Sequence, residues 1–242
     1  MLLLQMTEKN FEIYFEFNYS KLSVAAFNLV NEKLEYFKEA SYSSYFQKEK
    51  EINFQELKKL VEESIFQIEK STGKFVKDIY LMIETPQSIS FKLSVMKNNE
   101  GNVITKQDAM YLIQDAKQQL IKSNFDIGVI HIVVENYALD NYEYKFLPLN
   151  KRCKKFSIDL KFICFPKDLI RNFEQLFSKQ QILINKFICS SYVRAFKFEN
   201  SKDNICELGK NIAKGINKQE VVSIPKTIKK SGFFEKLFHF FR

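Results

Sequence analysis

The sequence predicts an α+β fold: a three-stranded antiparallel sheet at the N-terminus, then a subdomain of strands with two main helices, then a C-terminal amphipathic helix. Three observations predict it. Apolar and polar residues alternate from Phe11 to Phe17, which is the period of a strand. Apolar residues recur at helical spacing in 53–71 and 105–123. Phenylalanine and basic residues fill the segment 231–242.

The predicted N-terminal sheet consists of three short strands that follow one another closely. The strands cover residues 11–17, 22–30 and 33–40. The turn residues between them are Asn18, Tyr19 and Ser20, and then Asn31 and Glu32. Because such short connections join neighbouring antiparallel strands, we expect a meander.

Each main helix begins at a capping box. Asn53 is followed three residues later by Glu56, and Thr105 by Asp108, so each pair can satisfy free N–H groups of a first helical turn. Gly73 is placed to end the first helix. Further strands are expected at 75–84, 88–95, 127–137, 156–165 and 182–189. Further helices are expected at 166–179 and around 205–212.

Composition limits the possible functions. The net charge of +8 favours an anionic partner, such as a phospholipid surface or nucleic acid. Only two histidines are present, His131 and His239, and no cysteines have CxxC spacing, so we expect no metal site and no redox motif. No apolar run reaches the roughly 18 residues of a membrane span, and the apolar start is too short for a signal peptide. We therefore expect a cytoplasmic protein.

The end of the chain has the pattern of an interfacial helix. On a helix, five apolar residues share one face: Phe233, Phe234, Leu237, Phe238 and Phe241. Four cations accompany them: Lys229, Lys230, Lys236 and Arg242. An apolar aromatic face beside a cationic one is typical of helices that lie on an anionic phospholipid membrane. The alternative is a terminal helix that packs on the protein's own core.

Several motifs, taken in order, resemble those of the FtsA family of bacterial cell-division proteins. Residues 14–22 resemble its first hairpin, 52–95 the start of its inserted subdomain, and 104–108 the opening of that subdomain's second helix. Residues 129–140 and 233–242 resemble a later strand segment and the membrane-binding tail. The resemblance implies an actin-like remnant at 1–46, an FtsA-type inserted subdomain with a return strand at 47–198, a linker at 199–230 and a membrane helix at 231–242.

The hairpin departs from the family pattern where the family binds phosphate. Glu16 stands at the position of the family's Asp, and Asn18 and Tyr19 replace its Gly-Thr pair, with Ser20 next. We expect Glu16 to be an exposed strand residue. No Gly-Gly pair occurs anywhere in the chain, and we expect that a second actin-like lobe is not encoded. These departures predict a protein without a cofactor, without ATP binding and without enzymatic activity.

The resulting hypothesis is a non-catalytic cell-division scaffold, peripheral on the cytoplasmic face of the inner membrane. Its expected partners are anionic phospholipid and other division proteins, or a second copy of itself; the docking of FtsZ is doubtful because the lobe that binds it in the family is missing. One alternative is a pilus-assembly adaptor of the actin-like type. Another is a nucleic-acid-binding protein that uses the basic run 151–155, although no nucleic-acid motif is recognisable.

Overall fold

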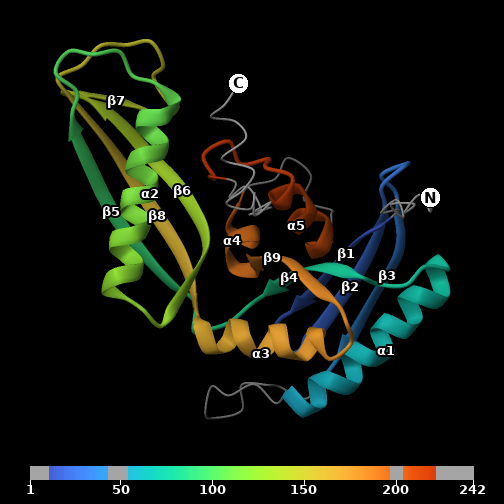
Figure 1. Cartoon of the computed structure of the whole chain (residues 1–242). Coiled ribbons are helices and arrows are strands. Elements are labelled where there is room, and N and C mark those ends of the chain that lie inside the picture. Colours follow the sequence, from blue (N-terminus) through green and yellow to red (C-terminus); the bar gives the residue numbers. More distant parts are fainter. Residues whose placement is uncertain (1–10, 43–53, 197–203, 222–242) are drawn as a thin grey trace, which may run out of the picture.

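The computed structural model describes residues 11–42, 54–196 and 204–221, and they form two β-sheets with helices packed on them (Figure 1). One sheet has five strands in the order β3-β2-β1-β4-β9. The other has four strands in the order β5-β8-β6-β7. This mixed architecture confirms the predicted α+β class.

The five-stranded sheet is built from both ends of the described chain. Its strands are β1 (Phe11–Phe17), β2 (Lys21–Asn28), β3 (Leu34–Ser41), β4 (Asp78–Ile83) and β9 (Leu183–Cys189). Strands β1 to β3 pair antiparallel in sequence order, which confirms the predicted meander. Strands β4 and β9 extend it by parallel pairing, β4 with β1 and β9 with β4. The sequence predicted these two strands but not the sheet that they join.

Helices cover both faces of the five-stranded sheet. On one face, α1 (Phe54–Thr72) and α3 (Lys167–Ser178) contribute buried residues to a large core. On the other face, α4 (Ser190–Ala195) and α5 (Ile205–Ala213) enclose a smaller core. The central strand β1 is therefore enclosed from both sides, and its last five residues are all buried.

The four-stranded sheet projects from the first and carries its own helix. Its strands are β5 (Ile89–Asn98), β6 (Ile127–Leu139), β7 (Tyr142–Tyr144) and β8 (Lys155–Pro166), all antiparallel. Helix α2 (Lys106–Ser123) lies along one face, as Figure 1 shows. Its capping box is confirmed: the Thr105 hydroxyl accepts a hydrogen bond from Asp108 N at 3.3 Å, and Asp108 accepts one from Thr105 N at 2.8 Å.

Two segments differ from the expected domain limits. The range 47–198, expected to be an inserted subdomain with a return strand, divides between the sheets, because α1, β4, α3 and β9 all pack in the five-stranded one. The described part of the expected linker, 204–221, is folded: Cys206 and Ile212 on α5 are fully buried against the sheet. The predicted membrane helix at 231–242 lies outside the described residues.

Candidate functional site

The three parallel strands of the five-stranded sheet end at the same level. Phe17 on β1 is in register with Ile83 on β4, and Ile83 with Cys189 on β9. Ligands of parallel sheets bind outside such carboxyl ends. The side chains gathered at this edge therefore decide whether a ligand could bind there.

A buried carboxylate and an arginine occupy this edge. Glu16 is 0% exposed and accepts a hydrogen bond from Arg194 Nη2 at 2.8 Å, while Nη1 of the same arginine lies 3.1 Å from Glu84. Burial raises the pKa of Glu16, and Arg194 offsets part of that rise. The expectation of an exposed Glu16 is wrong, because helices from later in the chain cover the face of β1 that carries it.

The polar groups of the β1–β2 hairpin form hydrogen bonds within the protein. The side-chain oxygen of Asn18 accepts hydrogen bonds from the backbone N–H groups of Ser20 at 3.0 Å and Lys21 at 2.8 Å. The Tyr42 hydroxyl donates to the backbone carbonyl of Asn18. Tyr19 is exposed at the tip. Since a phosphate loop must offer free backbone N–H groups, this turn has lost donors that it would need.

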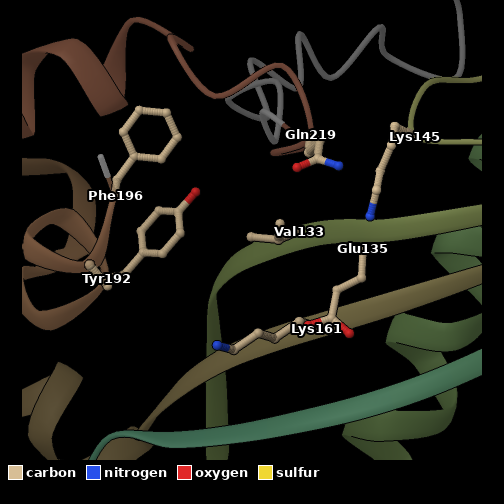
Figure 2. A pocket seen from close by; sticks show the side chains of 8 residues that line it. Val133, Glu135, Lys145, Lys161, Tyr192, Phe196 and Gln219 are labelled. Carbon is tan, nitrogen blue, oxygen red and sulfur yellow. The ribbon is translucent and has the colours of Figure 1, made fainter. Parts of the chain in front are cut away.

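A pocket that the sequence did not predict lies between the two sheets. It has a volume of about 530 Å³ and opens between α4 and the face of the four-stranded sheet that α2 leaves uncovered (Figure 2). The residues that line it are Val133, Glu135, Lys145, Lys161, Tyr192, Ala195, Phe196 and Gln219. They come from five separate parts of the chain, which is why no local motif indicated the pocket.

The one carboxylate in this pocket has an ion-pair partner, whereas the two lysines do not. Glu135 is paired with Lys92 at 2.9 Å. The side chains of Lys145 and Lys161 form no ion pair or hydrogen bond with any other residue that the structure describes. Figure 2 shows Lys145 reaching toward β6 and Lys161 extending toward Tyr192. The pocket therefore offers two uncompensated ammonium groups beside an aromatic wall.

A network of buried polar groups lies beside the pocket. His131 on β6 is fully buried; its Nε2 accepts a hydrogen bond from the backbone N–H of Cys189 at 2.9 Å. That nitrogen must be unprotonated, so the ring is neutral and its Nδ1–H donates to Glu220 at 2.8 Å. Burial lowers the pKa of His131, despite the nearby Glu220 carboxylate. The sequence had offered no role for this histidine.

Glu220 is the centre of this network. Besides His131, it accepts a hydrogen bond from the Tyr192 hydroxyl at 3.0 Å and lies 3.4 Å from Lys186 Nζ. Asn217 in turn donates to the Tyr192 hydroxyl at 2.7 Å. Burial alone would raise the pKa of Glu220, but the hydrogen bonds and positive charge around it prevail and lower it.

Other kinds of site are absent from the part of the chain that the structure describes. Within it, no three His, Cys, Asp or Glu side chains lie close enough together to hold a metal ion. No helix among residues 11–42, 54–196 and 204–221 is long and apolar enough to cross a membrane. The predicted membrane-binding residues fall outside these ranges: Lys229, Lys230, Phe233, Phe234, Lys236, Leu237, Phe238, Phe241 and Arg242.

Comparison with known proteins gives likeness only at the level of solved structures. No protein family and no curated protein matches this chain. One similar structure is a PilM-PilN type IV pilus biogenesis complex, with 8% identity over 75% of this chain and 48% of the other and a TM-score of 0.44. A Bacteroides thetaiotaomicron protein with an actin-like ATPase fold has 11% identity over 80% of this chain and 57% of the other, with a TM-score of 0.34.

A third similar structure is the cytoplasmic domain of EpsL, an inner-membrane component of the type II secretion system of Vibrio cholerae. It shares 7% identity over 78% of this chain and 60% of its own length, with a TM-score of 0.38. The chain thus spans about half to three fifths of the length of the solved structures that it resembles.

Proposed function

We propose that this protein is a non-catalytic adaptor, peripheral on the cytoplasmic face of the membrane, that serves as a cell-division scaffold of the FtsA type. One observation carries the non-catalytic part: Arg194 fills the carboxyl edge of the parallel strands by pairing with Glu16 and Glu84. Because one guanidinium is held between the two carboxylates, both of them are already paired with a cation of the protein. The Asn18 turn withdraws two backbone N–H groups that phosphate would need.

The pocket supports the adaptor part. Its two uncompensated lysines suit a carboxylate of a partner, and Tyr192 with Phe196 suits an apolar side chain next to it. An acidic and apolar segment of a partner protein has this chemistry. The basic run 151–155 offers less to a nucleic acid, since Lys151 lies over the Tyr144 ring at 4.4 Å and Arg152 bonds the Gly101 carbonyl at 3.4 Å.

The membrane part rests on the sequence of the tail and is tested there. Replacing Phe234 and Phe238 together by Glu puts two charges on the apolar face, which disfavours insertion by several kcal/mol in total. Co-sedimentation with anionic phospholipid vesicles should collapse, while the melting temperature of the domain stays unchanged. A matched control replaces Phe75 and Phe125, both exposed on the domain, by Glu and should keep full vesicle binding.

Two results would contradict the membrane proposal. If the Phe234 and Phe238 double variant still binds vesicles, the attachment lies elsewhere. If it instead lowers the melting temperature, the stripe belongs to the core of the protein, which is the alternative that the sequence left open.

The absence of nucleotide binding is a separate prediction. Calorimetric titration with Mg-ATP should show no saturable heat, because the hairpin donors are engaged and Arg194 fills the edge. The Asn18→Ala variant releases two N–H groups but not the edge, so it should also show none. Micromolar binding by the natural chain would mean that the hairpin opens to admit phosphate.

The division role is tested by location in the cell. A fluorescent fusion should gather at the division site and lose this position in the Phe234 and Phe238 double variant. Even labelling of the membrane would be consistent with a membrane adaptor but would contradict a role at the division site. Labelling at a cell pole together with pilus or secretion proteins would favour the pilus-type alternative. Association with the nucleoid would favour nucleic-acid binding.

A further inference from the structure

The chain makes a third connection between the two sheets, beyond the two connections that its course requires. The required ones are the β4–β5 and β8–α3 junctions, which lie close together at the base of the four-stranded sheet. The additional one is the segment 217–221, which we call the strap. It follows α5 on the five-stranded side and crosses to the edge of β6.

The strap attaches to β6 as a very short antiparallel strand. Glu220 pairs with Val133, and two backbone hydrogen bonds flank this pair: Val134 N donates to Gln219 O at 2.9 Å, and Val221 N donates to Ile132 O at 2.8 Å. A two-stranded pairing this short has little stability of its own. The attachment must therefore depend on side chains.

Those side chains come from three elements that meet at Glu220. His131 belongs to β6, Lys186 to β9 and Tyr192 to α4, and each faces the Glu220 carboxylate. His131 in turn accepts the Cys189 N–H and lies against the Tyr192 ring, with the ring centroids 4.5 Å apart. One carboxylate from the strap thus joins the four-stranded sheet to the strand and helix of the five-stranded side.

We propose that the strap is a detachable latch, fastened by Glu220, which fixes the placement of the four-stranded sheet on the five-stranded one. With the strap released, the two sheets stay joined at the base and through the contacts of His131 with Cys189 and Tyr192, and the four-stranded sheet gains freedom to pivot about these contacts. Release also removes Gln219 from the pocket wall and two of the hydrogen bonds that orient Tyr192. The latch itself does not depend on the proposed adaptor function.

The test compares amide hydrogen exchange and an inter-sheet distance in matched variants. In Glu220→Ala, the amide of Val134 and the amides of 217–221 should exchange at least tenfold faster than in the natural chain, while those of β1 keep their protection. Spin labels at positions 38 and 98, on exposed residues of β3 and of the end of β5 that lies away from the base, should report a broadened distance distribution. Lys218→Ala changes an exposed neighbour in the same strap and should alter neither readout.

Glu220→Gln keeps the shape but removes the charge, and should give an intermediate exchange rate. The proposal is overturned if the strap of Glu220→Ala exchanges like that of the natural chain, or if the label distance stays as narrow. It is equally overturned if β1 loses protection together with the strap, since the strap would then be an inseparable part of the core. Should Glu220→Ala fail to fold, the same three criteria apply to Glu220→Gln.

Discussion

At position 16 a carboxylate lies with none of its surface exposed, on a strand whose pattern predicts it outside. Glu12, Tyr14 and Glu16 alternate with apolar residues, which is typical of a strand with one wet face. Tyr14 and Glu16 are nevertheless buried, because α4 and α5, more than 170 positions later in the chain, cover that face. The local sequence pattern cannot show that helices from a distant part of the chain bury this face.

The same residue gives a prediction about stability. Arg194→Ala leaves the Glu16 carboxylate buried without its main partner, so the free energy of unfolding at pH 7 should fall by about 2–3 kcal/mol. This is less than the roughly 3–5 kcal/mol of a fully buried pair, because the arginine side chain is 38% exposed. Urea unfolding measures the loss. Arg171→Ala, which removes an exposed pair with Asp168, should change stability by less than about 0.5 kcal/mol.

The pH dependence of the Arg194→Ala loss has a definite sign. The pKa of Glu16 is raised in the fold, so protonation favours the folded state, and stability falls as pH rises through that pKa. The loss should therefore shrink as pH falls toward about 4.5, the ordinary value. Adding Glu16→Gln to Arg194→Ala should recover most of it at pH 7. A loss equal at all pH values would show that the arginine acts through packing alone.

At the scale of elements, local signals predicted most of the secondary structure. Helix α2 begins at its capping box, and the strands at 88–95, 127–137 and 156–165 all formed, extended by a few residues. The sequence could not predict which strands pair with each other. Strands β1, β4 and β9 are far apart in sequence, and their parallel pairing depends on the crossovers that α1 and the four-stranded sheet provide.

One small residue allows helix α5 to pack closely against the five-stranded sheet. Gly209 faces β4, and a Cβ there would lie 2.6 Å from Met82 Cε, in a fully buried position. Gly209→Ala should therefore lower the free energy of unfolding by about 1–3 kcal/mol through overpacking, although alanine favours helix by about 1 kcal/mol.

Thermal or urea unfolding checks this value against Gly128→Ala. At Gly128 the added methyl meets the flexible end of Ile170, which is only half-buried and can move, so its loss should be smaller. A stabilised Gly209→Ala would mean that Met82 has room to turn aside and that helix propensity decides the outcome.

For the whole molecule, acid should weaken the connection between the sheets. The pKa values of His131 and Glu220 are both lowered in the fold, so each group binds protons more readily when unfolded. The stabilisation that these two groups contribute is therefore fully present above the ordinary histidine pKa of about 6.5. The contribution of His131 is lost as the pH falls below that value, and the contribution of Glu220 is lost below about 4.5. Urea midpoints between pH 7.5 and 5 measure this fall.

The matched variant for acid unfolding is His131→Gln, whose amide oxygen can still accept the Cys189 N–H but takes up no proton. It should be less stable at pH 7.5 and show a flatter profile between pH 6.5 and 5. If the stability of both proteins falls equally steeply with pH, another group governs the acid response.

The candidate pocket and this network could not be predicted from the sequence for one reason. Their residues come from separate parts of the chain, including β6, β8, β9, α4 and the strap, which only the tertiary fold brings together.

The position of the strap has a mechanical meaning. It is the last described segment, and residues 222–242, with the predicted membrane helix, continue directly from it. Any tension on that end of the chain is carried first by two backbone hydrogen bonds and the Glu220 contacts, before it reaches α5. A load on the tail would thus act first on this short pairing, which would yield while both sheets keep their shape.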